Sequence, residues 1–230
     1  MFSNSFRGIN LVLFSIPFFF YILIPGVIVY NLALKVYNII NIPWILPLII
    51  YFSLLSYAML YLIQSFILLK LIFNPKKKEG EFDVNKLNPA IIYYSLSDII
   101  LSVVEKIFSV SLIPQPFYSN LIMKLFGNSC GKRNLINPVK DPYLLSLSDD
   151  SIIGFGVLIL GHEIVGKKII LKRIKIGSRV TIGANSIISP GVIIEDDVIV
   201  GANSYVKKYS VLKKGGFYVG SPAKLKARKK

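Results

Sequence analysis

Hydrophobic residues recur at every sixth position along the last third of the chain, with small and polar residues between them. Seven aliphatic residues follow one another in unbroken steps of six: Ile176, Ile182, Ile188, Ile194, Val200, Val206 and Leu212. A strict period of six does not follow the 3.6-residue turn of an α-helix, but it is typical of a parallel β-helix. Three hexamers close one coil of about 18 residues, and coils must stack because one coil cannot bury its own interior.

The positions between these aliphatic residues predict the turns. Four residues after each aliphatic position stands a residue that is nearly always small or β-branched: Val180, Ser186, Val192, Val198, Ser204, Ser210 and Gly216. The sequence Gly-Ala-Asn-Ser occurs at Gly183 and again at Gly201, one coil apart. Tight turns that visit left-handed backbone angles favour Gly, Asn and Asp, so we expect these residues at the corners of the coils.

The six-residue period breaks once. Leu147, Ile153 and Ile159 form an earlier run, and Ile164, Ile170 and Ile176 would form another that is out of register with it by one residue. We therefore expect the chain to leave the coil between Ile159 and Ile176. His162, the single histidine of the chain, stands at the start of this excursion. Further back, Cys130 and Ile136 are six apart, which predicts that Cys130 is a buried coil residue rather than a reactive thiol.

Residues 1–74 have a different pattern, with two long apolar segments and no acidic residue. The segments Ile9–Leu34 and Ile42–Leu69 are each long enough to cross a hydrocarbon core, which takes about 20 apolar residues. Their prolines are tolerated in membrane helices, where neighbouring groups satisfy the backbone. A cleaved signal peptide fits poorly, because the first apolar run is too long and no small-residue cleavage pattern follows. We predict a transmembrane helical hairpin over residues 1–74.

The basic residues that flank this hairpin predict its orientation. Lys70 and the segment Pro75–Lys78 (PKKK) follow the second apolar run, whereas the turn between the two runs is uncharged apart from Lys35 near its start. Because cytoplasmic loops carry an excess of Lys and Arg, we expect a multi-pass membrane protein whose C-terminal domain lies on the cytoplasmic side.

Residues 75–127 predict two short amphipathic helices. Asn88 and Pro89 read as an N-cap and a first-turn proline, and apolar residues then recur at helical spacing. A second helix is expected around Phe117. These helices could lie in the membrane interface or pack on the domain that follows, and the sequence does not choose between the two. A β-helix domain is predicted at 128–217 and a basic tail at 218–230.

The chain is 53% hydrophobic yet carries a formal net charge of +15. Nine Lys or Arg residues and no acid lie between Lys207 and Lys230. The simplest expectation for this tail is a solvated, partly disordered end near anionic lipid headgroups. Nucleic-acid binding is disfavoured, because aromatic residues are not interleaved with these cations as stacking platforms. One cysteine and one histidine exclude an intrachain disulfide and a structural zinc site, so we expect no metal.

From about Leu125 to its end, the sequence resembles the hexapeptide-repeat acyltransferases that have a left-handed β-helix, in particular the branch that acetylates sugars and xenobiotics. The resemblance is carried by the repeat, by the excursion that contains a histidine, and by the segments IGANSIISPGV (Ile182–Val192), VGANSYV (Val200–Val206) and YVGSPAK (Tyr218–Lys224). It implies an all-β fold, a left-handed parallel β-helix, which is here preceded by two transmembrane helices and short amphipathic helices. It also implies acetyl-CoA as co-substrate, a sugar, glycan or lipid-linked acceptor, and a homotrimer with active sites between subunits.

The same resemblance implies roles for individual residues. His162 matches the catalytic histidine of the family, and a neutral imidazole with a pKa near 6.5 suits a general base at cytoplasmic pH. Ala184 and Ala202 match positions whose backbone meets the pantetheine arm. Lys207 stands where the family has a threonine beside the cofactor, and Lys224 matches a basic residue near the coenzyme's phosphates.

Two neighbours of His162 matter to this interpretation. Gly161 replaces a threonine that often precedes the family's histidine. Glu163 adjoins His162, but neighbouring residues on an extended strand point to opposite faces, so adjacency does not make it the carboxylate that orients the ring. Zinc carbonic anhydrases share the β-helix but need three histidines, which this chain does not have.

Two functions from different classes are therefore considered. The first is a membrane-anchored O- or N-acyltransferase, an acetyltransferase that uses His162 as general base. The second is a catalytically silent, membrane-tethered trimeric scaffold. The histidine excursion and the Gly-Ser-Pro-Ala-Lys ending together favour the enzyme, because a scaffold has no reason to keep both.

Overall fold

The fold is taken from a computed structural model, which describes residues 26–38, 46–67, 70, 79–86, 88–109, 114–127, 129–136 and 139–228. The chain divides into two compact units. One comprises Met1–Phe73 with Ser102–Leu112, and the other comprises Asn74–Leu101 with Ile113–Lys230.

The first unit is helical wherever it is described. Residues 26–38 form a helix, and α2 spans Leu46–Ile67. The second predicted span, Ile42–Leu69, is therefore helical over most of its length, whereas residues 9–25 of the first span lie outside the described residues. Among those that are described, one helical segment, Pro47–Ser65, is long and apolar enough to cross a membrane. A two-helix membrane hairpin is not shown by this structure and stays a prediction.

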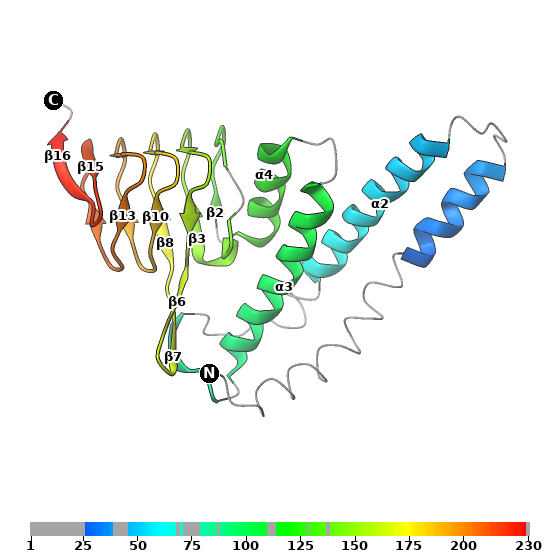
Figure 1. Cartoon of the computed structure of the whole chain (residues 1–230), viewed down its shortest axis with the longest axis horizontal. Coiled ribbons are helices and arrows are strands. Elements are labelled where there is room, and N and C mark those ends of the chain that lie inside the picture. The colour runs from blue at the N-terminus through cyan, green and yellow to red at the C-terminus, as the bar shows by residue number, and fades with distance from the viewer. Residues whose placement is uncertain are drawn as a thin grey trace. The chain divides into compact units, whose positions relative to one another are not determined.

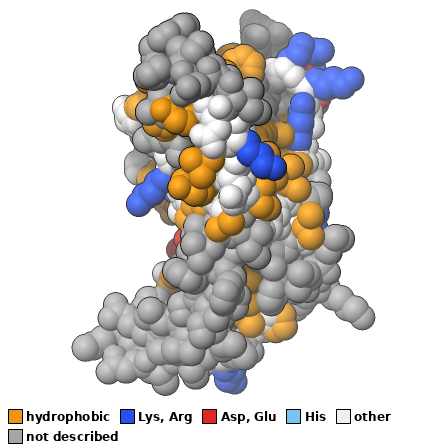
Figure 2. Space-filling model, turned by 90° about the vertical axis from the view of Figure 1, so that its right-hand side faces the viewer, with side chains coloured by type: hydrophobic (Ala, Val, Ile, Leu, Met, Phe, Trp, Pro, Cys, Tyr) orange, Lys and Arg blue, Asp and Glu red, His pale blue; other side chains and the backbone are white. Residues whose placement is uncertain are grey.

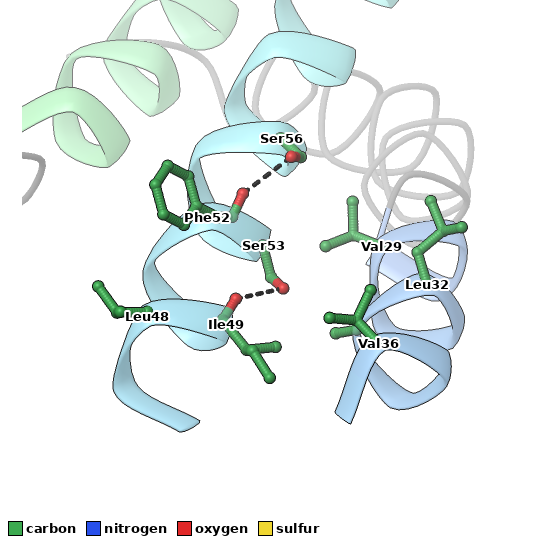
Figure 3. A pocket seen from close by; sticks show the side chains of 9 residues that line it. Val29, Leu32, Val36, Leu48, Ile49, Phe52, Ser53 and Ser56 are labelled. Carbon is green, nitrogen blue, oxygen red and sulfur yellow. Dashed lines mark hydrogen bonds between the residues drawn. The ribbon is translucent and has the colours of Figure 1, made fainter. Parts of the chain in front are cut away.

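The surface of α2 is apolar, and the hydroxyl groups of its serines are satisfied within the helix. Ser53 and Ser56 donate hydrogen bonds of 2.6 and 2.8 Å to the carbonyls of Ile49 and Phe52 (Figure 3). Both serines line a groove of about 360 Å³ between α2 and the helix at 26–38, together with apolar side chains such as Val29. Large hydrophobic side chains are exposed on α2: Leu48, Ile50, Phe52, Ile63 and Ile67. Figure 2 shows hydrophobic side chains, in orange, at the molecular surface.

The second unit contains a parallel β-helix with three faces (Figure 1). The first face holds β2 (Ser129–Cys130), β3 (Leu145–Leu147), β8 (Ile174–Ile176), β11 (Ile193–Ile194) and β14 (Val211–Leu212). The second holds β4 (Ile152–Ile153), β9 (Thr181–Ile182), β12 (Ile199–Val200), β15 (Gly216–Val219) and β16 (Lys224–Arg228). The third holds β5 (Leu158–Ile159), β10 (Ile187–Ile188) and β13 (Tyr205–Val206). All neighbours within these faces are parallel except β15 and β16.

Register and burial confirm the six-residue period. Ile182 pairs with Val200 and Ile194 with Leu212, each 18 residues further along the chain. The seven aliphatic residues of the repeat point inward, and none of them is more than 3% exposed. Ser186, one of the small residues between them, is fully buried and donates from its hydroxyl to the carbonyl of Gly201 at 2.9 Å. The aliphatic positions of the repeat thus form the core.

The corners confirm most of the prediction that Gly, Asn and Asp would occupy them. Left-handed backbone angles occur at Asp150, Asn185, Gly191, Asp197 and Asn203, but also at Arg133, Arg179 and Tyr209. The stacking of coils explains why arginine is tolerated at two of these positions. At one corner the guanidinium of each reaches the carboxylate of the next coil, Arg133 to Asp150 and Arg179 to Asp197, and each pair makes two hydrogen bonds. These bidentate pairs offset the unfavourable backbone angle of the arginines.

The excursion predicted between Ile159 and Ile176 is confirmed, and it is a β-hairpin. Ile159 pairs with Ile188, 29 residues further on instead of 18. The additional 11 residues are Gly161–Leu171, which contain the antiparallel strands β6 (His162–Val165) and β7 (Lys168–Leu171). Figure 1 shows this hairpin projecting from the stacked coils. Ile164 and Ile170 therefore belong to the hairpin and not to a coil.

A strand from before the β-helix joins this hairpin. β1 (Gly80–Asp83) pairs antiparallel with β7, so that Gly80 lies opposite Leu171, which lies opposite His162. Beside this strand, Glu79 forms an ion pair with Arg173 at 3.2 Å. The segment that follows the predicted membrane hairpin is thus paired with β7, the strand next to the one that carries His162.

The two predicted amphipathic helices are present as α3 (Pro89–Ser109) and α4 (Gln115–Phe126). Asn88 caps α3 as expected, because its side-chain oxygen accepts a 2.9 Å hydrogen bond from the backbone N–H of Ala90. The sequence left open whether these helices lie in the membrane interface or pack on the domain that follows, and α4 packs on that domain. It packs on the first coil, where Met123 is 1% exposed and belongs to the β-helix core.

Two further features concern the sequence-based expectations for Cys130 and for the basic tail. Cys130 lies in the first coil and packs against the core, but it is only partly buried. Burial raises the pKa of its thiol, against the smaller lowering effects of Asn134 and Lys124, which keeps it protonated as expected of a structural cysteine. The basic tail is not disordered throughout, because Lys224–Arg228 folds back as strand β16 along β15. The tail thereby covers the edge of the last coil.

Candidate active site

His162 is held by a buried aspartate from an earlier coil. Asp141 lies immediately before a 3₁₀ turn (Pro142–Leu144), and its side chain is 2% exposed. One carboxylate oxygen, Oδ2, is 2.6 Å from Nδ1 of His162 and also accepts a 2.9 Å hydrogen bond from the backbone N–H of Gly161. The aspartate therefore fixes both the imidazole ring and the backbone at the point where the hairpin begins.

The hydrogen bond from His162 to Asp141 defines the tautomer of the ring. An ionised carboxylate only accepts hydrogen bonds, so Nδ1 carries the proton that it donates to Asp141. The neutral ring then has its basic lone pair on Nε2. The side chain of His162 is 22% exposed, which leaves the ring partly open to a reactant. This is the geometry of a general base with an orienting carboxylate.

The pKa of His162 is raised above its ordinary value. Burial by itself would lower it, but the hydrogen bond and the negative charge of Asp141, together with the more distant charge of Asp98, outweigh that effect. An anion beside the ring stabilises the imidazolium, which is the form that a base adopts after it has taken a proton.

Glycine is required at position 161 because side chains of the 3₁₀ turn approach its backbone closely. A Cβ atom at this position would lie 2.7 Å from Cβ of Leu144 and 3.2 Å from Cβ of Asp141. A larger residue at this position would therefore push against Leu144 and crowd the buried aspartate.

Glu163 does not orient the ring. Its carboxylate forms an ion pair with Lys208 at 3.3 Å, on the corner of the β-helix from which the hairpin leaves. The argument that adjacency does not make Glu163 the partner of His162 is confirmed.

An aromatic side chain from α3 also contacts the imidazole of His162. The ring centroids of Tyr94 and His162 are 4.8 Å apart, with the planes tilted by 51°. Burial, followed by the charges of Asp141 and Asp98, raises the pKa of Tyr94. Sequence reasoning assigned no chemistry to this helix and missed Tyr94. It also missed Asp141, which lies outside the hexapeptide repeat, and whose only signal is an acidic residue before a proline.

The four predicted cofactor residues lie at two corners. Ala184 and Ala202 stack one coil apart, and the carbonyl of Ala184 accepts a 2.9 Å hydrogen bond from the backbone of Asn203. The turn that leads into Lys224 continues the same corner, because the N–H of Ala223 donates to the carbonyl of Tyr205 at 2.8 Å. Lys207 is exposed on the corner from which the hairpin leaves. Within one chain, Ala184, Ala202 and Lys224 thus lie at one corner. Lys207 lies at another corner, the one from which the hairpin with His162 leaves.

No group of three or more His, Cys, Asp or Glu residues that could hold a metal ion occurs in the part of the chain that the structure describes. The groups gathered around His162 are instead a carboxylate, a backbone amide and an aromatic ring.

Comparisons with known proteins agree with this fold. The profile of a family described as "Hexapeptide repeat of succinyl-transferase" matches residues 173–208. No sequence among curated proteins matches the chain. A maltose O-acetyltransferase from Clostridium difficile 630 is similar in structure, with a TM-score of 0.51 and 18% identity over 65% of this chain and 92% of its own.

Two further structures are more distant. A hexapeptide-repeat acetyltransferase from Vibrio cholerae O1 biovar eltor, complexed with acetyl-coenzyme A, gives a TM-score of 0.49 at 16% identity over 63% of this chain and 93% of its own. A galactoside acetyltransferase in complex with coenzyme A gives 0.44 at 18% identity over 59% and 82%. At these identities the likeness to the maltose O-acetyltransferase shows a shared fold: the chain has the β-helix of the hexapeptide-repeat acetyltransferases.

Proposed function

We propose that this chain is a membrane-anchored, CoA-dependent acyltransferase that moves an acetyl group from acetyl-CoA to a hydroxyl or amine of a sugar, glycan or lipid-linked acceptor. The observation that carries the proposal is the pair formed by His162 and the buried Asp141, at the point where the chain leaves a β-helix of the acetyltransferase type. A silent scaffold would give no reason to bury a carboxylate against the single histidine.

The chemistry follows from the geometry of this pair. Nε2 of His162 takes the proton of the acceptor hydroxyl or amine as that group attacks the thioester carbonyl carbon. The tetrahedral intermediate collapses, the carbon–sulfur bond breaks, and the imidazolium returns its proton to the leaving thiolate of CoA. Asp141 stabilises the imidazolium between these steps and holds the ring by its Nδ1–H. The products are the acetylated acceptor and free CoA, and no other reactant is needed.

The donor site is proposed to lie between subunits. Ala184, Ala202 and the turn before Lys224 follow one corner of the β-helix, whereas His162 leaves from another. A homotrimer would place that corner of one subunit against the hairpin of the next. The backbone at the two alanines would then meet the pantetheine arm, with Lys224 and Lys207 near the phosphates of CoA, where a cation makes charge-assisted hydrogen bonds.

The membrane anchor is part of the same proposal. The apolar, exposed surface of α2 suits a lipid environment better than water, and the Lys-rich segment after it would lie on the cytoplasmic side. There the enzyme has access to acetyl-CoA and to acceptors carried on lipid.

The test is acetyl-CoA turnover by the full chain in detergent, followed as release of the CoA thiol with a panel of glycans and amines. General-base catalysis contributes about 10²- to 10⁴-fold, so His162→Ala should lower kcat by that amount and leave CoA affinity unchanged. Glu163→Gln, in the same strand, is the matched control and should keep near wild-type turnover.

Unchanged turnover by His162→Ala would overturn the role of His162. Failure of the wild type to bind CoA in titration calorimetry would favour the scaffold. Light scattering on the detergent-solubilised protein tests the trimer separately, and a monomer would contradict the proposed site between subunits.

A further inference from the structure

The excursion that carries His162 is closed at its base by a hydrogen bond between its two ends. The backbone N–H of Lys172 donates to the carbonyl of Gly161 at 2.8 Å, which joins the residue before β6 to the residue after β7. We call this base the neck of the excursion. On one side of the neck, the buried Asp141 binds the N–H of Gly161 as well as the imidazole. The position of the ring therefore depends on the neck as well as on Asp141.

A second carboxylate, that of Glu79, binds the other side of the neck. Its Oε2 accepts a 3.2 Å hydrogen bond from the backbone N–H of Arg173, and its Oε1 lies 3.2 Å from Nη2 of the same arginine. Nζ of Lys172 is 3.7 Å from Oε2. The side chains of Glu79 and Arg173 are 29% and 32% exposed, and salt screens partly buried pairs less than exposed ones. One carboxylate thus holds both the backbone and the side chain of the residue that precedes β8.

Glu79 acts on the whole excursion because it immediately precedes a third strand. β1 pairs along all four of its residues with β7, and the N–H of Val84 extends the ladder to the carbonyl of Lys167 at 2.9 Å. β7 is therefore the central strand of the sheet β1-β7-β6. A two-stranded hairpin is marginally stable in water, whereas three strands with an apolar face are stable. Ile169 and Leu171 of β7 are 2% and 0% exposed, so β1 completes a sheet that has such a face.

Another glutamate on the same strand makes a weaker contact. Glu81 lies 3.7 Å from Nζ of Lys168, and the two side chains are 55% and 68% exposed. Ion pairs with this exposure contribute little to stability. Glu79 differs because it accepts a hydrogen bond from a backbone amide and also pairs with a cation. Glu81 is therefore a matched control for Glu79.

We propose that Glu79 is a positioning residue for the base and that it acts through Arg173 and the neck of the excursion. Glu79 at one end of the excursion and Asp141 at the other keep Nε2 of His162 in one place relative to the β-helix. Without Glu79, β1 loosens from β7 and the imidazole loses that place, while the coils keep their fold because their strands pair with one another. The kinetic consequence of this inference rests on the proposed acyltransferase function.

The first test is the kinetics of the full chain in detergent. Glu79→Gln keeps an acceptor for the N–H of Arg173 but removes the ion pair, and Glu79→Ala removes both. A misplacement of about 1 Å in an active site costs on the order of 10²-fold in rate, so we expect kcat to fall about tenfold to 10²-fold in Glu79→Ala and less in Glu79→Gln. The KM for acetyl-CoA should be unchanged, because the residues proposed to bind the donor lie outside the excursion. Glu81→Gln should leave both constants unchanged.

The second test is spectroscopic and does not depend on turnover. His162 is the only histidine of the chain, so NMR of protein made with nitrogen-labelled histidine, and without a histidine tag, shows this ring alone. At a pH where the ring is neutral, we expect the wild type and Glu81→Gln to give one set of signals, with the proton on Nδ1. Glu79→Ala should give a mixture of both tautomers. Its Tm should stay close to that of the wild type.

The outcomes separate positioning from a structural role. Either an unchanged His162 spectrum or an unchanged kcat in Glu79→Ala would overturn the proposal, the first even if the Tm falls, because Glu79 would then only stabilise the fold. Equal effects of Glu81→Gln would overturn it as well. If Glu79→Ala does not fold, the same criteria apply to Glu79→Gln. A wild type that neither binds CoA nor releases it from acetyl-CoA would remove the proposed function, and the His162 spectrum would still decide whether Glu79 positions the ring.

Discussion

At the scale of single residues, the chemistry of the site depends on the charge that Asp141 places beside His162. The ring must be neutral to accept a proton, and Asp141 raises its pKa by a hydrogen bond and by its charge, against the opposing effect of burial. The acidic limb of the kcat/KM profile should therefore lie above the ordinary imidazole value of about 6.5.

Asp141→Asn tests this directly. The substitution keeps the shape of the side chain but removes the anion, which leaves burial as the main influence on His162. The pKa should fall, and the acidic limb of the kcat/KM profile should move to lower pH, while the maximal rate falls because the imidazolium is no longer stabilised. The pH profile of CoA release measures both effects. The assignment of Asp141 would be contradicted if the acidic limb of the kcat/KM profile kept its pH in Asp141→Asn, or if it also moved in Glu163→Gln.

Gly161 offers a second residue-scale prediction. Gly161→Ala places a Cβ 2.7 Å from that of Leu144, and overpacking of this kind costs about 1–3 kcal/mol. We expect a lower free energy of unfolding, together with a loss of turnover as Asp141 is displaced. Gly166→Asn is the matched control in the same hairpin, because nothing lies within 4 Å of a Cβ there and Asn tolerates the left-handed angle. Equal effects of the two substitutions in urea unfolding would contradict the close-packing argument.

How far the sequence predicts the site varies from residue to residue. His162 could be located because it is the only histidine and stands where a strict repeat breaks. Asp141 precedes it by 21 residues in a stretch without periodicity, so only the stacking of coils brings the two together. Tyr94 and Asp98 belong to a helix whose apolar face was visible in the sequence, but periodicity does not indicate which side chain meets the imidazole.

At the scale of elements, alternation along each short strand separates core from surface. Ile193 and Ile194 form β11, yet Ile194 is 1% exposed and Ile193 is 38% exposed. Truncating a buried isoleucine to alanine costs about 2–5 kcal/mol. Ile194→Ala should lower the free energy of unfolding by about that amount, and Ile193→Ala, the same change one residue earlier, by clearly less. Unfolding of the detergent-solubilised chain in urea measures both, and similar losses would contradict the inward-facing assignment.

The elements that the sequence predicted are those with a local signal. The short strands from β8 to β14 follow the repeat, and the cap at Asn88 marks the start of α3. β1 and β16 were not predicted, because each is defined by a distant partner rather than by its own pattern. Residues 80–83 become a strand only through pairing with β7, and the basic residues of the tail do so only through pairing with β15.

At the scale of the whole molecule, two kinds of attachment to a membrane are possible, and salt distinguishes them. The nine cations between Lys207 and Lys230 would hold the chain to anionic lipid by charge, which is screened over about 3 Å at 1 M ionic strength. An apolar helix that spans the bilayer is held by the burial of its side chains, which salt does not weaken.

We therefore expect the full chain to stay with the membrane pellet during washes with 1 M salt and to enter solution only with detergent. The double substitution Lys224→Gln with Lys226→Gln, both exposed on β16, should leave this behaviour unchanged, because these charges add only about 1 kcal/mol each near a lipid surface. Immunoblots of pellet and supernatant provide the measurement. Release of the wild type by salt alone would show attachment through the basic residues and would contradict an anchor formed by α2 and the segment before it.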